Sequence, residues 1–160
     1  MKSLVVYYSL SGTTRKVATV LAQDLDSEIE EMRCRRYSPG IWGNIRAGYD
    51  SLTGNLPLIE PLLHSLPQFE LVVIAGPIWA SHPATPVRSF LKQERARLPR
   101  VAFVLTHGGG WGERSLHEME KIAGRAPIAA LAVREQDVKE QRFASALSSF
   151  EAKLRMPEAA

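Results

Sequence analysis

The chain has 160 residues, of which 45% are hydrophobic and 23% are charged, and its formal net charge is +3. These values are typical of a globular domain and exclude a disordered or collagen-like chain. Cys34 is the only cysteine, which excludes an intrachain disulfide and a multi-cysteine zinc site and favours a reducing compartment. We therefore expect a single domain, residues 1–160, in the cytoplasm.

The distribution of basic residues disfavours a nucleic-acid-binding protein, and the N-terminal residues disfavour a secreted or membrane-spanning one. The basic residues are spread along the chain, in RCRR, KQERARLPR and KEQRF, which predicts solvated faces rather than a nucleic-acid site. The start, MKSLVVYYSLSG, is too short in apolar length for a signal-peptide core or a membrane span. No spacing of His, Cys, Asp or Glu resembles a metal site. We expect no nucleic acid, no membrane span and no metal.

Four short apolar runs predict buried strands, and they are LVVYY (4–8), LVVIA (71–75), VAFVLT (101–106) and IAALAV (128–133). They do not alternate with polar residues, so both faces of each strand should be buried, as in a parallel sheet between two layers of helices. The segment SEIEEMRC (27–34) does alternate. It predicts an edge strand with Ile29 and Met32 pointing inward.

Apolar residues at helical spacing separate these strands: Val17, Val20, Leu21 and Leu25; Val87, Phe90 and Leu91; Leu116, Met119 and Ile122; and Phe143, Leu147, Phe150 and Leu154. Strands that alternate with helices predict an α/β fold, an open doubly wound sheet of five parallel strands. We expect the order 2-1-3-4-5, which places a ligand crevice after Tyr8 and Ala75, at the carboxyl ends of strands 1 and 3.

The segment 35–68 is too long for a plain loop, and such long excursions are usually functional. Ile41, Ile45, Tyr49 and Leu52 have helical spacing after Ser38 and Pro39. These last two residues predict an N-cap and a first turn. A second helix is expected at 58–66.

The segment SLSGTT (9–14) lies directly between the first predicted strand and the first predicted helix. Gly12 permits a tight turn of the backbone, the helix N-terminus favours an anion, and four hydroxyl groups supply further donors. The segment therefore predicts a phosphate site, although a helix cap that binds nothing is an alternative. It matches neither the Walker A pattern nor the GxGxxG fingerprint, which disfavours ATP, GTP and a Rossmann-type NAD site.

Two further loops follow the third and fourth of these strands. GPIWASHPATP (76–86) presents Trp79, and THGGGWG (106–112) presents Trp111 beside three consecutive glycines. Two aromatic residues at one crevice suit the stacking of a flat heteroaromatic ring. His82 and His107 are candidate acid/base groups, whereas nothing indicates that Cys34 is reactive.

These three loops, SLSGTT, GPIWASHPATP and THGGGWG, resemble the three flavin loops of the flavodoxin family, in particular of its short-chain members. The resemblance spans most of the chain and implies a noncovalently bound FMN. It implies that Ser9, Ser11, Gly12, Thr13 and Thr14 bind the phosphate and that Trp79 covers one face of the isoalloxazine. It further implies that Gly108, Gly109 and Gly110 border the polar edge of the ring and that Trp111 covers its other face. Pro77, Ile78 and His107 are the remaining residues expected to bind the cofactor.

The resemblance leaves three functions open. The first is an electron carrier with a redox partner protein, and the second is an NAD(P)H-dependent FMN or quinone reductase in which 35–68 forms a substrate pocket or a homodimer contact. The third is a flavin-free binding module. The chain departs from the acidic flavodoxins by its sequence pI of about 9.2. Arg46, Arg88, His82 and His107 around the crevice would favour the anionic reduced flavin and two-electron transfer.

Overall fold

The predicted apolar runs form the centre of a parallel sheet in the computed structural model, which describes residues 1–156. The strands are β1 (Ser3–Tyr7), β2 (Glu28–Glu31), β3 (Leu71–Trp79), β5 (Arg100–His107) and β6 (Ala130–Arg134). Their order is β2-β1-β3-β5-β6, with all neighbours parallel. The predicted order 2-1-3-4-5 of the parallel strands is therefore confirmed. A short strand, β4 (His82–Pro83), was not predicted and pairs antiparallel with β3.

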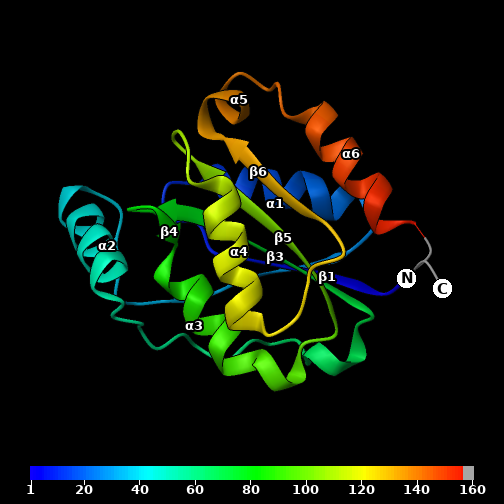
Figure 1. Ribbon diagram of the computed structural model, residues 1–160, viewed down its shortest axis with the longest axis horizontal. Coiled ribbons are helices and arrows are strands. Elements are labelled where there is room, and N and C mark those ends of the chain that lie inside the picture. Colours follow the sequence, from blue (N-terminus) through cyan, green and yellow to red (C-terminus); the bar gives the residue numbers. More distant parts are fainter. Residues whose placement is uncertain (157–160) are drawn as a thin grey trace.

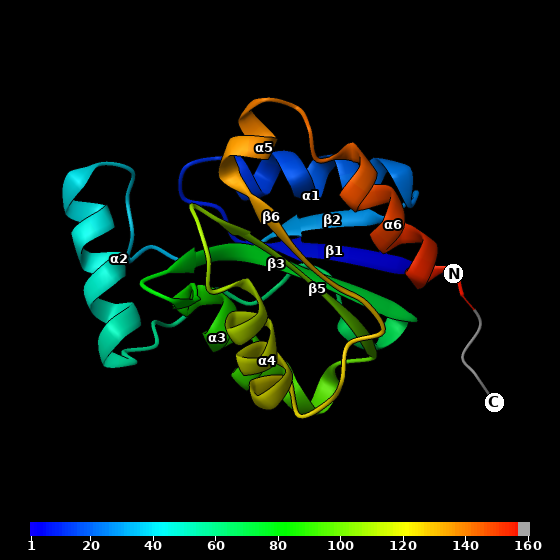
Figure 2. The same ribbon diagram turned by 45° about the horizontal axis from the view of Figure 1, so that its top comes forward.

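Helices cover both faces of the sheet, as Figures 1 and 2 show. One face carries α1 (Thr13–Asp24), α5 (Glu135–Lys139) and α6 (Ala144–Leu154), and the other carries α3 (Thr85–Glu94) and α4 (Gly112–Ala123). The 3-10 turns η1 (Leu66–Gln68) and η2 (Arg95–Arg97) directly precede β3 and β5 in the chain. Within residues 1–156, no helix combines the length and apolarity needed to cross a bilayer.

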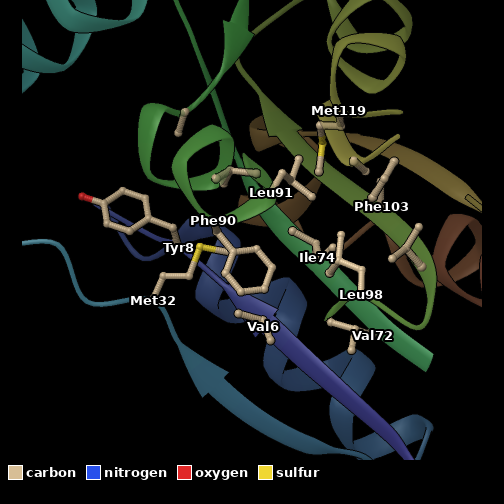
Figure 3. Packing of buried hydrophobic residues seen from close by; sticks show 14 of the residues in the cluster. Val6, Tyr8, Met32, Val72, Ile74, Phe90, Leu91, Leu98, Phe103 and Met119 are labelled. Atoms are coloured by element: carbon tan, nitrogen blue, oxygen red, sulfur yellow. The ribbon is translucent and has the colours of Figure 1, made fainter. Parts of the chain in front are cut away.

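Alternate residues of the central strands enter two separate cores. Val6, Val72, Ile74 and Phe103 pack with helices α3 and α4 on one face (Figure 3). Val5, Val73 and Val104 pack against α1 and α6 on the other face. These side chains are all fully buried, which explains why the strands read as continuous apolar runs.

The edge strand differs from its prediction at one position. Met32 is buried as expected, but the side chain of Ile29 is 39% exposed. Ile29 lies opposite Val5 on the outermost strand, where no further strand shields it, so only one side of its surroundings is covered.

The excursion 35–68 contains one helix rather than two. This helix, α2 (Ile41–Thr53), begins after Gly40, whose φ is 117°, rather than at Ser38 and Pro39 as predicted. The backbone carbonyl of Ser38 lies against the Cα of Gly43, so the chain before the helix folds back on its first turn. α2 stands apart from the other helices at one end of the molecule (Figures 1 and 2).

The predicted helix 58–66 is wrong, since this segment is extended and carries no helix before η1. Backbone N–H groups of the segment 58–66 are hydrogen-bonded to Glu30 in the edge strand β2 and to Arg33 just after that strand. Leu63 and His64 donate backbone N–H bonds to the Glu30 carboxylate at 2.5 and 3.0 Å, and Glu60 donates one to the Arg33 carbonyl at 2.9 Å. Pro61 also lacks the N–H that a helix interior requires.

His64 joins this extended segment to β2 through two carboxylates. Its Nδ1 lies 2.6 Å from Glu30 Oε2 and its Nε2 lies 2.6 Å from Glu28 Oε2. The hydrogen bond to Glu30, followed by that to Glu28, raises the pKa of His64 against the opposing effect of burial.

The raised pKa of His64 predicts a pH-dependent stability. Its contribution is fully present below about 6.5, the value of an unfolded histidine, and is lost as pH rises through the higher folded value. We expect the free energy of unfolding, measured with urea, to fall over this range, and the fall to be smaller in His64→Gln. The exposed histidine of α4 gives the control His117→Gln, which should retain the wild-type profile. If the pH dependence of the free energy of unfolding is the same in His64→Gln as in the wild type, His64 does not cause it.

Candidate functional site

The first loop forms an open helix N-terminus at the carboxyl end of β1. Gly12 is the N-cap of α1 with a φ of 97°, a conformation that costs little only for glycine. No side chain among residues 1–156 caps this helix by a hydrogen bond. The Ser9 hydroxyl instead accepts the Gly12 N–H at 3.0 Å, which shapes the loop. The N–H groups of the first turn of α1 are therefore available to an external acceptor.

The hydroxyls of this loop are held at different depths. Ser11 is exposed and its Oγ lies 3.4 Å from Thr13 Oγ1. Thr14 is buried, and its hydroxyl lies 2.7 Å from the hydroxyl of Thr106 on β5. If Thr106 donates in this pair, the Thr14 proton is free for another acceptor. This bond also ties the first loop to the carboxyl end of β5.

Trp79 ends β3 and is held by two tyrosine rings. Tyr8 and Tyr37 each meet it in a T-shaped contact, with centroid separations of 5.5 and 5.0 Å. Edge-to-face contacts of this kind fix ring orientation as well as burying apolar surface. Burial raises the pKa of both tyrosines, that of Tyr37 to about 12, so both phenols are neutral at ordinary pH.

The chain leaves Trp79 through a strained two-residue turn. Trp79 pairs with His82, and the two residues between them, Ala80 and Ser81, have φ values of 47° and 67°. Positive φ at both positions is typical of a type I′ hairpin turn, in which glycine or asparagine is usual. The Ser115 hydroxyl donates to the Ser81 carbonyl at 3.2 Å and helps to hold this turn.

A buried carboxylate fixes Tyr37 behind the tryptophan. Asp50 of α2 is fully buried and accepts hydrogen bonds from Arg36 at 2.5 and 3.0 Å, from the Tyr37 hydroxyl at 2.8 Å and from Asn55 at 3.0 Å. The Arg36 bonds, together with those from Tyr37 and Asn55, outweigh burial and lower the pKa of Asp50 to about 2. The Tyr37 hydroxyl also lies 2.6 Å from the Thr85 hydroxyl on α3.

Hydrogen bonds of the Arg88 guanidinium connect α2 to the Trp79 hairpin. This buried arginine of α3 donates to the Pro83 carbonyl at 2.9 Å and to the Ser51 carbonyl and hydroxyl at 3.0 and 2.9 Å. Ser51 in turn donates to the Trp79 carbonyl at 2.5 Å. The Glu118 carboxylate lies 3.7 Å from Arg88 and 2.7 Å from His82 Nδ1. The guanidinium is thus part of the scaffold, and its charge is partly offset by Glu118.

The first loop and the Trp79 hairpin line one pocket of about 390 Å³. The predicted site residues in its wall are Ser9, Ser11, Thr13, Thr14, Pro77, Ile78 and Trp79. Gly12 shapes the loop without lining the pocket. A second cavity of about 270 Å³ adjoins the first and shares Asn44, Ile78 and Trp79 with it.

The third predicted loop does not line either cavity. Gly108, Gly109 and Gly110 are exposed, and Trp111 is 56% exposed with the Arg114 guanidinium 5.6 Å from the centre of its ring. His107 Nδ1 accepts the Gly110 N–H at 3.2 Å. Burial, followed by the charge of Arg134, lowers the pKa of His107, which suits the neutral ring that such an acceptor requires.

Sequence reasoning missed four lining residues of the first pocket: Leu10, Asn44, Glu135 and Lys139. Leu10 lies within the first loop, and Asn44 comes from α2. Glu135 and Lys139 belong to α5, which directly follows β6. The signal for this helix was present, because the carboxyl end of the fifth parallel strand must meet the same edge of the sheet as the other loops. Lys139 is the one cation among the described lining residues.

Comparisons with known proteins agree with this architecture. No protein-family model matches the sequence, and no curated protein sequence is significantly similar to it. The structure is similar to that of a flavoprotein in complex with FMN from Lactobacillus acidophilus NCFM, with a TM-score of 0.73 and 25% identity over 87% of this chain and 97% of that one. The chain has a flavodoxin-like fold.

A more distant flavodoxin-like structure gives the same result. The flavodoxin of Streptococcus pneumoniae TIGR4 has a TM-score of 0.54 and 12% identity, over 96% of this chain and 99% of that one. The predicted resemblance to flavodoxins is therefore confirmed at the level of the fold. In this flavodoxin-like chain the pocket lies beside the carboxyl ends of β1 and β3, where the direction of winding reverses.

Proposed function

We propose that this protein binds FMN noncovalently in the pocket of about 390 Å³ and acts as a flavin-dependent redox protein. The observation that carries the proposal is that the uncapped N-terminus of α1, its hydroxyls and Trp79 line this single pocket. Convergent N–H and hydroxyl donors suit a phosphate monoester, and a rigid aromatic side chain suits a flat ring. The FMN complex of the similar Lactobacillus flavoprotein supports the choice of ligand.

The donors of the site divide between the two ends of such a ligand. Ser9, Ser11, Thr13 and Thr14 would hold the phosphate with the first N–H groups of α1, and Lys139 would add a positive charge on the opposite wall. Trp79 would orient the isoalloxazine, while Pro77 and Ile78 exclude water beside it. We retain His107, Gly108, Gly109, Gly110 and Trp111 as proposed neighbours of the ring, a role that requires the exposed third loop to close over the ligand.

Bound flavin would supply the electron chemistry, and the chain would supply position and electrostatics. Part of the positive charge that the sequence predicts around the crevice is offset by neighbouring groups, while Arg46 is exposed on α2 and lines neither of the two cavities beside Trp79. Arg88 and His82 share the Glu118 carboxylate, the pKa of His107 is lowered, and the pocket is lined by one anion, Glu135, as well as one cation, Lys139. An approximately neutral pocket favours our first candidate, an electron carrier that serves a redox partner protein.

A flavin-dependent NAD(P)H or quinone reductase is the second candidate, because a second cavity adjoins Trp79. It is lined by Asn44, Ala47, Gly48, Ile78, Trp79 and Ala80, and its volume of about 270 Å³ would admit a small planar electron acceptor. We propose the cytoplasm for either activity, because a chain with Cys34 as its only cysteine forms no intrachain disulfide and suits a reducing compartment.

Titration with FMN tests the proposed site. We expect Thr13→Val to weaken FMN binding about tenfold or more, because it removes a donor to a charged phosphate without changing side-chain shape. The matched control is Thr19→Val, which changes an exposed threonine of the same helix whose hydroxyl bonds only within the helix. Equal affinities in both variants would contradict the phosphate assignment, and a wild-type chain that retains no FMN would indicate the flavin-free module.

Reduction of the loaded protein separates the two redox functions. Two distinct spectral phases during an anaerobic reductive titration would support the electron carrier. A single phase together with steady oxidation of NAD(P)H in the presence of quinone would support the reductase.

A further inference from the structure

Helix α2 exposes an apolar face that no other described element covers. Five large side chains project from it: Ile41, Trp42, Ile45, Tyr49 and Leu52, with exposed fractions of 75%, 83%, 57%, 67% and 69%. The opposite face is buried and holds Gly43, Ala47, Asp50 and Ser51. The apolar face therefore points directly away from the body of the molecule, on a helix that stands at its end (Figures 1 and 2).

Hydrogen bonds on the buried side of α2 prevent the helix from rotating to bury its exposed apolar side chains. The buried side is fixed by the Asp50 hydrogen bonds and by Ser51, which bonds both Arg88 and the Trp79 carbonyl. Rotating the helix to bury the five apolar side chains would expose Asp50 and break these bonds. Because exposed patches of this size mark interaction sites in soluble proteins, the face requires a partner from outside the fold.

We propose that the apolar face of α2 binds the same face of a second copy of this chain. The exposed surface of the five side chains is roughly 700 Å², since a large side chain presents on the order of 200 Å² and these five are between 57% and 83% exposed. A stable interface of standard size buries about 800 Å² per partner. The face thus supplies most of the area that a dimer needs, and the residues that flank it on α2 would supply the rest.

The chemistry of the face favours an identical partner. None of its five side chains is charged, and the exposed charge on α2 is the single Arg46 beside them. Arg36 and Arg46 line a further cavity with Trp42, Ile45 and Tyr49, so the positive charge lies beside the apolar side chains and not among them. The apolar side chains themselves complement a copy of the same face in a two-fold arrangement. They offer little to select the acidic surface of another protein. Gly48, with open space where a side chain would stand, leaves room beside the stripe for a bulky side chain of the second helix.

This dimer would bring the second copy to the edge of the flavin-binding region. Asn44 and Gly48, which flank the apolar face, also line the cavity of about 270 Å³ beside Trp79. The second copy would therefore narrow the entrance to that cavity. The dimer itself does not depend on FMN, so it can be tested in protein prepared without flavin.

Sedimentation equilibrium of the flavin-free full chain tests the proposal. We expect a mass twice the monomer value of 17.8 kDa, with a dissociation constant in the micromolar range or below. Ile45→Lys, which places a cation in the middle of the face, should weaken association at least tenfold, and Leu52→Lys should do the same. The matched control is Leu63→Lys, because Leu63 is 82% exposed but lies outside α2, and this variant should dimerise like wild type.

Three results would overturn the proposal. A wild-type chain that stays monomeric at all concentrations shows that the face does not bind a second copy. Dimers that both α2 variants leave unchanged place the interface elsewhere. A monomer that sediments with vesicles of anionic phospholipid, and loses this binding in Leu52→Glu, shows that the face binds a lipid surface instead. None of these results depends on whether the pocket holds FMN, which the titration above measures separately.

Discussion

Replacing Asp50 by alanine is expected to lower the free energy of unfolding by about 2–3 kcal/mol. The substitution leaves the buried Tyr37 hydroxyl without its carboxylate partner and removes both Arg36 bonds. The loss should fall below that of a fully buried ion pair because the Arg36 side chain is 38% exposed and can turn to water. Urea unfolding followed by circular dichroism measures it.

Asp137→Ala is the matched control for Asp50→Ala. Asp137 forms a surface pair with Arg142 at 3.3 Å, and such pairs contribute only about 0–1 kcal/mol. Equal losses in the two variants would contradict the role assigned to the buried cluster.

The pKa of Asp50, about 2, lies below the ordinary unfolded value of about 3.9. Its contribution is therefore present above that unfolded value and is lost as pH falls through about 2.

Replacing Trp79 by alanine is expected to weaken FMN binding about 30-fold. Stacking of a base on an aromatic side chain contributes about 1–3 kcal/mol, and the middle of this range corresponds to that factor. The flavin absorption bands should shift and the fluorescence of the bound flavin should rise, because the aromatic neighbour is removed. Fluorescence titration measures both affinity and emission in one experiment.

Two other tryptophans make this experiment specific. Trp42→Ala changes an exposed tryptophan of α2 outside both cavities and should leave FMN affinity and fluorescence unchanged. Trp111→Ala tests whether the third loop closes over the ring, since only then should the flavin spectrum respond. Absence of any spectral change in Trp79→Ala would mean that Trp79 only packs between Tyr8 and Tyr37.

The central sheet was predictable because burial leaves a direct pattern in the sequence. Strands that are covered on both faces carry few polar residues, so continuous apolar runs such as 71–75 and 101–106 can be recognised as buried strands. The position of the first loop followed from the same pattern, since it fills the short gap between a buried strand and an amphipathic helix. The antiparallel β4 could not be found in this way, because a two-residue strand has no periodicity.

The excursion 35–68 was less predictable because contacts distant in sequence decide its structure. The apolar spacing that correctly indicated α2 gave no information on whether that face is buried, and it is exposed. The segment 58–66 has apolar residues but is held extended by Glu30, whose carboxylate takes two of its amide groups. Cross-chain hydrogen bonds of this type leave no local pattern in either partner.

The walls of the pocket come from opposite ends of the chain, and this has a consequence for the order of events during synthesis. Residues 9–14 leave the ribosome before Glu135 and Lys139, which take their places only after β6 has paired with β5. A nascent chain that ends before β6 contains the first loop and Trp79, but it lacks the α5 residues that line the pocket. Uptake of a ligand into the complete pocket must therefore follow translation of α5.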